Sequence, residues 1–201
     1  MTVCIGLTGP IGCGKSTIAR WLGDRGAVVI DADAVARSVT APGEPAHDEI
    51  LARFGEAITA EDGTLDRAAL AEIVFADASS LRALEAIVHP AVRPRIIAAI
   101  EAATADGALA VVIEAIKLVE GGLAELCDEV WLVTCRPDVQ RDRLVARGVT
   151  PDDTDRRIAA QAGLDDRVRP RATRVIDASG SVAEVRAAAL AALEAALSRR
   201  A

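Results

Sequence analysis

The sequence predicts an α/β protein in which helices cover both faces of a parallel sheet. Apolar runs of strand length alternate with segments of helical periodicity along most of the chain. The first apolar run, residues 3–8, leads through a glycine-rich loop straight into a helical segment. Of the 201 residues, 51% are hydrophobic, which is ample for a sizeable buried core.

The glycine-rich loop at residues 9–17 reads GPIGCGKST and fits the phosphate-loop pattern G-x-x-x-x-G-K-[ST]. In such a loop backbone N–H groups converge on phosphate oxygens, and the N-terminus of the following helix adds partial positive charge. Lys15 then reaches the outer phosphates, and the Ser16 hydroxyl can hold Mg²⁺. The loop therefore predicts a nucleoside triphosphate site, which kinases, GTPases, ATPase motors and sulfotransferase-like enzymes share.

Two carboxylates follow the second predicted strand, a short buried run at residues 27–30. If that strand lies beside the first one in a parallel sheet, Asp31 and Asp33 sit on the edge that carries the phosphate loop. Asp33 either takes part in the chemistry or N-caps a helix that begins at Ala34. Next to a phosphate loop we favour the first interpretation.

Residues 42–105 contain no run typical of a strand, so we expect a helical insert there. Asp66 is expected to cap one of its helices, and Ser79 or Ser80 to start another that Pro90 interrupts. His89 lies at that expected junction, where it either caps or packs the helix, our default interpretation, or contacts a substrate.

Three further strands are predicted at residues 109–113, 130–134 and 175–177. Glu114 follows the first of them and is either an acid that assists Mg²⁺ or an ordinary strand end. Ser181 and Glu184 form a capping-box pattern that opens the last helix. The inner face of that helix is expected to carry Val182, Val185, Ala189, Leu193 and Leu197.

An arginine-rich segment lies between the last two strands. From Arg136 to Arg174 there are ten arginines and seven aspartates, although the whole chain has a net charge of −7. Most of these arginines are expected to form solvated ion pairs with the aspartates. One or two should reach the nucleotide, and we choose Arg143 and Arg147 because they precede an expected hinge at residues 148–151.

Charge and composition disfavour several classes of protein. The acidic net charge and the scarcity of aromatic residues argue against binding of nucleic acid. No apolar run approaches 18 residues and no export signal is visible, so we expect neither membrane insertion nor secretion. The four cysteines lack the spacing of a metal site or a disulfide framework, so we expect free thiols in a reducing cytoplasm.

Together these stretches resemble dephospho-CoA kinases over essentially the whole chain. The resemblance rests on a set of short segments and on their order along the chain. These segments are residues 6–9, which lead into the phosphate loop, and residues 31–33, 65–67, 73–75, 87–90, 143–147, 157–161 and 175–177. It implies that Gly12 to Thr17 bind ATP and that Asp33 faces the 3′-hydroxyl of the acceptor. It also implies that the helical insert holds dephospho-CoA and that the arginine-rich segment is a lid.

The resemblance also implies roles for individual residues. Those implied in catalysis are Lys15, Asp33, Arg143 and Arg147, with Ser16 at the metal. Those implied in ATP binding are Gly12, Cys13, Gly14, Lys15, Ser16, Thr17, Arg147 and Asp177. Those implied in acceptor binding are Thr8, Asp33, Arg67, His89 and Lys117.

The chain departs from the family pattern in two places. Cys13 stands where the family usually has Ser, and residues 116–120 read IKLVE in place of a usual Pro-Leu-Leu-aromatic-Glu. Lys117 there either pairs with a phosphate of the substrate or neutralises Glu114 or Glu120.

These observations and the resemblance define one expectation for the whole chain. We expect a three-layer P-loop kinase fold with a parallel five-stranded sheet, with a core at about 1–41, 106–138 and 172–201, an insert at about 42–105 and a lid at about 139–171. The expected activity is ATP-dependent, Mg²⁺-assisted phosphorylation of the ribose 3′-hydroxyl of dephospho-CoA, the last step of CoA biosynthesis. A nucleoside or nucleoside-monophosphate kinase is the alternative, and a nucleotide-operated switch is disfavoured because no N-K-x-D stretch is present. We expect small-molecule partners only, in a cytoplasmic monomer or weak homo-oligomer.

Overall fold

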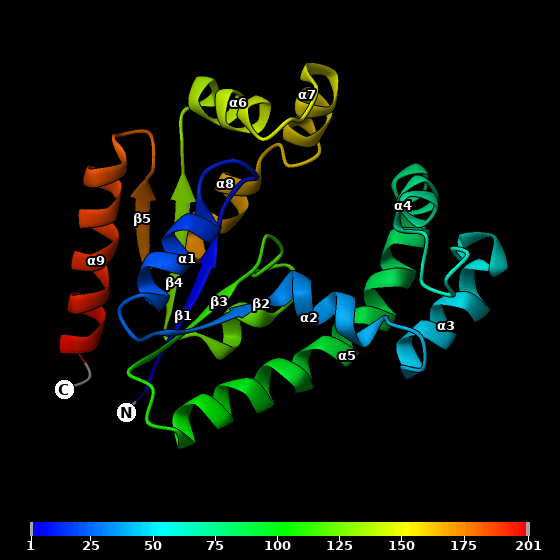
Figure 1. Ribbon diagram of the computed structural model, residues 1–201, viewed down its shortest axis with the longest axis horizontal. Helices are drawn as coiled ribbons and strands as arrows, with labels where there is room; N and C mark the ends of the chain where they lie inside the picture. The colour runs from blue at the N-terminus through cyan, green and yellow to red at the C-terminus, as the bar shows by residue number, and fades with distance from the viewer. Residues whose placement is uncertain (1, 200–201) are drawn as a thin grey trace. The chain divides into compact units, whose positions relative to one another are not determined.

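A computed structural model describes residues 2–199 and divides into two compact units, each considered by itself below (Figure 1). The first unit comprises residues 1–31 and 100–201, and the second comprises residues 32–99. The strands are β1 (Val3–Thr8), β2 (Val28–Asp31), β3 (Ala110–Glu114), β4 (Glu129–Thr134) and β5 (Arg174–Asp177). The α-helices are α1 (Lys15–Gly23), α2 (Ala32–Val39), α3 (Pro45–Phe54), α4 (Arg67–Ala76), α5 (Ala78–Ala105), α6 (Pro137–Ala146), α7 (Pro151–Ala159), α8 (Leu164–Val168) and α9 (Val182–Ser198). Short 3-10 turns are η1 (Glu56–Ile58), η2 (Leu123–Leu126) and η3 (Arg169–Arg171).

The five strands form one parallel sheet in the order β2-β3-β1-β4-β5, which confirms the predicted sheet. The condition considered for Asp31 and Asp33 is not met, because β2 pairs with β3 and not with β1. All five carboxyl ends still meet at one edge, so Asp31 lies opposite Glu114, which in turn lies opposite Leu7. This edge continues into the phosphate loop, as expected for open α/β sheets.

One face of the sheet is covered by α1 and α9, as Figure 1 shows. Alternate residues of β1 point into this core, where they pack with Trp131 of β4 and with small and aliphatic residues of the two helices. Trp131 is fully buried, and its indole N–H donates to the Glu129 carboxylate at 2.7 Å, so the ring loses no hydrogen bond on burial.

The opposite face of the sheet packs closely against the segment after β3. A Cβ atom on Gly6 would lie 2.5 Å from Leu118 Cδ2 and 2.9 Å from Cys127 Sγ, so a larger residue there would require these side chains to shift. The short helix α8 also packs on this face, against β4, and buries Val168. The sheet is therefore covered on both faces, which gives the three layers predicted.

The second strand is not buried as predicted. Val28 and Val29 are each 39% exposed, because β2 forms an edge of the sheet. A run of apolar residues looks the same in sequence at an edge and at the centre of a sheet, so only the strand order distinguishes the two.

The last helix begins as predicted, with a capping box in which Ser181 and Glu184 satisfy each other's backbone N–H groups. These hydrogen bonds hold the pKa of the Glu184 carboxyl below its usual value. The inner face of α9 differs from the prediction at one residue. Val182 is 70% exposed, whereas Val185, Ala189 and Leu193 are buried. Val182 lies in the first turn, which extends beyond the layer of the core.

The second unit is helical, with α2, α3, α4 and most of α5 around a core of Ile50, Ile58, Leu65, Leu70 and Val74. Asp66 caps α4 as predicted, accepting hydrogen bonds from the backbone N–H groups of Ala68 and Ala69. The expected start of α5 was wrong, because the cap is Asp77 and not Ser79 or Ser80. Both serines donate to the Asp77 carboxylate, and these hydrogen bonds hold the pKa of that carboxyl far below its usual value.

The prediction that Pro90 interrupts a helix was also wrong. Pro90 and Pro94 both lie inside α5, which runs without a break from Ala78 to Ala105. Apolar residues before Pro90 pack on the core of the second unit, and Val92 and Ile96 after it are buried. Burial on both sides offsets the hydrogen bonds that the two prolines cannot make. His89 therefore lies within a helix and not at a junction.

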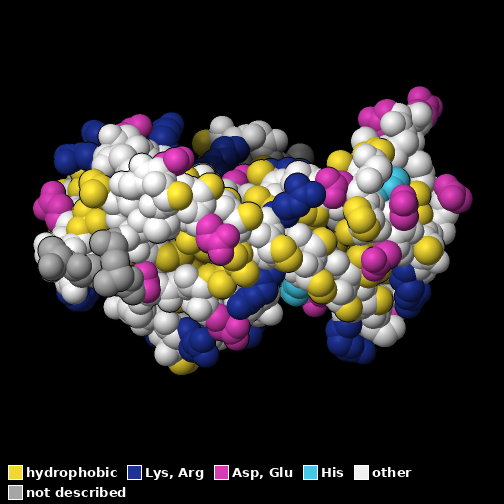
Figure 2. Space-filling model, turned by 90° about the horizontal axis from the view of Figure 1, so that it is seen from below, with side chains coloured by type: hydrophobic (Ala, Val, Ile, Leu, Met, Phe, Trp, Pro, Cys, Tyr) yellow, Lys and Arg dark blue, Asp and Glu magenta, His cyan; other side chains and the backbone are white. Residues whose placement is uncertain are grey.

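On the face shown in Figure 2, basic and acidic side chains are interspersed and do not gather in one patch. Within residues 2–199 no helix combines the length and the apolarity that crossing a membrane requires.

Candidate functional site

The phosphate loop turns tightly between β1 and α1. Gly9, Gly12 and Gly14 have φ angles of 142°, 80° and 98°, a region in which side chains are strained. Gly9 also approaches β4 so closely that a Cβ atom would lie 2.0 Å from the Val133 carbonyl oxygen. The two glycines that the pattern specifies, Gly9 and Gly14, and Gly12 between them are therefore favoured by the backbone conformation, and Gly9 is required by packing as well.

Lys15 lies in the first turn of α1, with only 8% of its surface exposed. Its Nζ donates to the carbonyl oxygens of Gly9 at 2.8 Å and of Pro10 at 3.2 Å. These two bonds hold the ammonium group across the mouth of the loop. Burial there strengthens its attraction for an anion.

Ser16 is brought to the acid at the end of β3. Its hydroxyl donates to Glu114 Oε1 at 2.6 Å, although the two residues are 98 positions apart in sequence. A hydroxyl and a carboxylate are hard oxygen ligands of the kind that Mg²⁺ prefers. The residues present at this corner of the loop therefore fit a magnesium ion, with Ser16 and Glu114 on the protein side.

Two glutamines that the sequence did not single out as site residues bracket the loop at Ile11. Gln140 of α6 donates to the Ile11 carbonyl at 2.7 Å, and Gln161 Oε1 accepts from the Ile11 N–H at 2.7 Å. Gln140 is buried, so its amide is committed to this contact. Gln161 lies in a stretch that carried the family resemblance, whereas nothing in the sequence pointed to Gln140.

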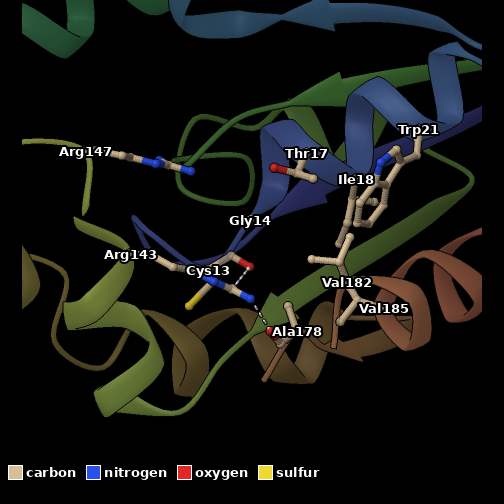
Figure 3. Close-up of a pocket in the computed structure, with 10 residues that line it drawn as sticks. All are labelled: Cys13, Gly14, Thr17, Ile18, Trp21, Arg143, Arg147, Ala178, Val182 and Val185. Atoms are coloured by element: carbon tan, nitrogen blue, oxygen red, sulfur yellow. Dashed lines mark hydrogen bonds between the residues drawn. The ribbon is translucent and has the colours of Figure 1, made fainter. Parts of the chain in front are cut away.

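A cavity of about 200 Å³ opens beside the loop (Figure 3). Thr17, Ile18 and Trp21 line it from α1, and Val182 and Val185 line it from the start of α9. Its apolar walls are typical of a pocket for a flat ring system, and the loop at its edge suits phosphates. The complete lining is Cys13, Gly14, Thr17, Ile18, Trp21, Arg143, Arg147, Ala178, Val182 and Val185.

Arg143 and Arg147 both line this cavity but are held differently. Arg143 is half-buried and donates to the carbonyl oxygens of Ala178 at 2.8 Å and of Cys13 at 3.4 Å, as Figure 3 shows. Arg147 is the exposed C-cap residue of α6. Arg143 thus joins the loop to the β5–α9 connection, and Arg147 extends over the cavity.

Several other arginines of the segment form exposed ion pairs, which confirms the expectation for them. The pairs are Arg136 with Asp138, Arg141 with Asp155, Arg157 with Asp153, and Arg167 with Glu120. Glu120 thus has an arginine partner. Lys117 itself is exposed.

Asp177 and Thr8 hold backbone segments next to the phosphate loop through hydrogen bonds. Asp177 accepts hydrogen bonds from the N–H and hydroxyl of Ser179, which lower the pKa of its carboxyl and fix the turn at Ala178. Thr8 is fully buried, and its hydroxyl donates to the Ile116 carbonyl at 3.0 Å. Both side chains therefore support the backbone around the loop.

Asp33, Arg67 and His89 belong to the second unit. Helix α2 begins at Ala32 and Asp33 lies in its first turn, so the alternative in which Asp33 caps a helix from Ala34 was wrong. Arg67 donates to the Thr40 hydroxyl at 3.2 Å, and burial together with the charge of Arg37 lowers its pKa.

The expectation of free thiols was wrong for two of the four cysteines. Cys13 and Cys135 form a disulfide, with Cα atoms 5.2 Å apart, while Cys4 and Cys127 are not disulfide-bonded. The partners are 122 residues apart in sequence. Their spacing could not reveal a contact that depends on β1 and β4 being neighbours.

The fold and the phosphate loop define a P-loop small-molecule kinase. The family model described as "Dephospho-CoA kinase" matches residues 3–184. A dephospho-CoA kinase of Symbiobacterium thermophilum is 47% identical over 184 residues, covering 91% of this chain and 77% of the relative. The chain belongs to the dephospho-CoA kinase family.

Solved structures share the fold. The crystal structure of TT1252 from Thermus thermophilus has a TM-score of 0.82 and 35% identity, covering 96% of this chain and 97% of that chain. Dephospho-CoA kinase from Campylobacter jejuni has a TM-score of 0.72 at 20% identity and full coverage of both chains, which supports the fold.

Replacing Gln140 by Leu should loosen the phosphate loop. The change keeps the size of the side chain but leaves the part-buried Ile11 carbonyl without this donor, which costs about 1–3 kcal/mol. Urea denaturation should show that loss, and calorimetry should show weaker ATP binding. Arg141→Ala on the same helix is the matched control, because its exposed ion pair is worth about 1 kcal/mol or less. Equal effects of the two changes would contradict a role of Gln140 in holding the loop.

Proposed function

We propose that this protein transfers the γ-phosphoryl group of ATP to the ribose 3′-hydroxyl of dephospho-CoA, giving coenzyme A and ADP. The observation that carries the proposal is the phosphate loop, with Lys15 buried across its mouth, in a chain that belongs to the dephospho-CoA kinase family. As an enzyme of the last step of CoA biosynthesis it would act in the cytoplasm, as a monomer or weak homo-oligomer.

The proposed nucleotide site combines the loop and the cavity beside it. Backbone N–H groups of residues 12–17 bind the phosphates, and the Lys15 ammonium group stabilises the negative charge of the outer phosphates. The adenine ring enters the apolar cavity against Trp21, at the side of the loop. Arg143 and Arg147 hold the charge that develops on the transferred group. Asp177 contributes by fixing the cavity wall.

Magnesium is the implied metal, and Ser16 and Glu114 are the residues that would hold it. When bound with ATP, Mg²⁺ neutralises phosphate charge and so eases phosphoryl transfer.

Roles toward the acceptor are proposed for residues of each unit taken separately. Asp33 orients the 3′-hydroxyl and accepts its proton late in the transfer. A carboxylate is a weak base, but a loose transition state mainly requires positioning. Arg67 binds acceptor phosphate through its guanidinium group. His89 and Lys117 contact the remainder of the acceptor, and Thr8 supports the wall near Lys117 through Ile116.

In this proposal residues 42–105 form the acceptor-binding insert and residues 139–171 form a lid. The decisive assay measures ATP consumption with dephospho-CoA, pantetheine, adenosine and AMP as acceptors. Turnover with dephospho-CoA alone is expected. Preference for adenosine or AMP would instead indicate a nucleoside or nucleoside-monophosphate kinase.

Lys15→Ala should abolish phosphoryl transfer. Loss of one charged contact to the transferring group costs on the order of 3 kcal/mol or more in the barrier. Initial rates with dephospho-CoA test this, and thermal melting shows whether the fold is intact. Lys15→Met, which keeps the buried stem, should be equally inactive. Wild-type turnover in either variant would refute the proposed role of the loop.

Arg147→Ala should lower turnover by roughly tenfold to a thousandfold, because an arginine directed at developing charge acts mainly in the transition state. The readout is kcat at saturating ATP. Arg156→Ala, which removes an exposed partner of Asp153, is the control and should keep kcat. Unchanged kinetics of Arg147→Ala would assign this arginine to the solvated surface.

Asp33→Asn should separate binding from chemistry. The side chain keeps its size but loses the ability to accept a proton, and positioned proton transfer is worth about 10²- to 10⁴-fold. We expect kcat to fall in that range, while the affinities for ATP and dephospho-CoA measured by calorimetry change only a few-fold. Full activity would direct the search for the acceptor-side group to Asp31 or Glu114.

A further inference from the structure

The disulfide between Cys13 and Cys135 joins two parts of the nucleotide site. Cys13 is the fully buried residue between the last two glycines of the phosphate loop. Cys135 directly follows β4 and is half-buried. The loop reaches it because β1 and β4 pair in parallel and because Gly9 lies against the Val133 backbone.

The bond fixes the loop to the base of α6. Arg136, the next residue after Cys135, is the N-cap of that helix, and Pro137 is its first residue. Helix α6 carries Gln140, which holds Ile11, and Arg143, which holds the Cys13 carbonyl. Any movement of α6 relative to the phosphate loop must therefore take place around this covalent bond.

The other two cysteines differ from this pair in a way that matters for reactivity. A hydrogen bond with Cys4 and burial raise the pKa of the Cys127 thiol well above its usual value. A protonated, buried thiol is a poor nucleophile, and the two residues form no disulfide although they lie together. By contrast Cys13 and Cys135 are held together, with Cα atoms 5.2 Å apart, and the half-buried Cys135 is open to a small disulfide.

We propose that Cys13 and Cys135 form a reversible thiol–disulfide site that reacts with low-molecular-weight disulfides and slows turnover when oxidised. Since it regulates the nucleotide site, the idea rests on the function proposed above. Disulfides that form in reducing compartments are usually regulatory or catalytic rather than structural. The position of this one, in the phosphate loop itself, favours regulation.

The exchange takes place in two steps. The half-buried Cys135 thiolate attacks one sulfur of a disulfide R–S–S–R, forming a mixed disulfide and releasing one R–S⁻. The Cys13 thiolate then attacks Cys135 Sγ, forming the internal disulfide and releasing the second R–S⁻. Two electrons pass from the protein to R–S–S–R, and the two protons lost by the cysteines end on the released thiolates. Reduction by two equivalents of a thiol reverses both steps.

Oxidation should affect turnover and binding differently. A loop held in one conformation loses less freedom when ATP binds, so affinity should not fall. Lid opening and product release often limit kcat, and a fixed base of α6 should slow them. We expect kcat to fall at least fivefold while the Kd for ATP changes by no more than twofold.

The experiment compares the intact protein after treatment with dithiothreitol and with glutathione disulfide. Alkylation followed by peptide mass spectrometry counts the thiols, calorimetry gives the Kd for ATP, and initial rates give kcat. Treatment with glutathione disulfide should remove two thiols, those of Cys13 and Cys135, and dithiothreitol should restore both thiols and kcat. Cys135→Ser should have the kcat of the reduced protein and no response, with Cys135→Ala as a second variant should the first fail to fold. Cys127→Ser is the matched control and should respond fully.

Three results would overturn the proposal: both thiols still alkylated after treatment, a disulfide that forms without changing kcat, or one that dithiothreitol cannot reduce in the folded protein. Failure of the proposed function is distinguishable, because dephospho-CoA would then not be phosphorylated in either redox state. The redox comparison would in that case use basal ATP hydrolysis, while the thiol count and ATP affinity need no acceptor.

Discussion

The close contact between the phosphate loop and the end of β4 is the constraint on which the first unit depends. A Cβ atom on Gly9 would lie 2.0 Å from the Val133 carbonyl, and one on Gly12 would lie 3.1 Å from the Gln140 carbonyl. The loop therefore rests directly on the backbone of β4 and α6. This approach brings Ile11 to the two glutamines, Cys13 to Cys135, and Arg143 to the carbonyl groups that orient it.

An acidic protein that binds a polyanion must place its cations selectively. The arginines of the 136–174 segment that face aspartates form exposed ion pairs, which cancel their charge at the surface. Arg143 is instead held by the neutral carbonyls of Ala178 and Cys13. A neutral acceptor orients a guanidinium group without cancelling its charge, so positive potential remains at the cavity. The partner of each arginine therefore decides whether its charge is neutralised at the surface or remains available at the cavity.

The polar groups of the site are held by backbone geometry more than by other side chains. Lys15, Arg143 and Gln140 all donate to carbonyl oxygens of the loop or of the neighbouring turn. Asp177 acts in the same way, since it fixes the turn that presents the Ala178 carbonyl. Such contacts set the positions of charged groups before a ligand arrives, which is the condition for electrostatic stabilisation of a transition state.

The sequence by itself determined the parts that depend on local order. The phosphate loop, the five strands, the capping box at Ser181 and the Asp66 cap follow from residues close together in the chain, and the same is true of the family. The tertiary structure alone decided what depends on strand order: β2 as an exposed edge, Glu114 beside Ser16, and Gln140 beneath Ile11. It also decided that Pro90 stays within a helix and that Cys13 meets Cys135. These contacts join residues up to about 130 positions apart, and neither spacing nor periodicity records which strands become neighbours.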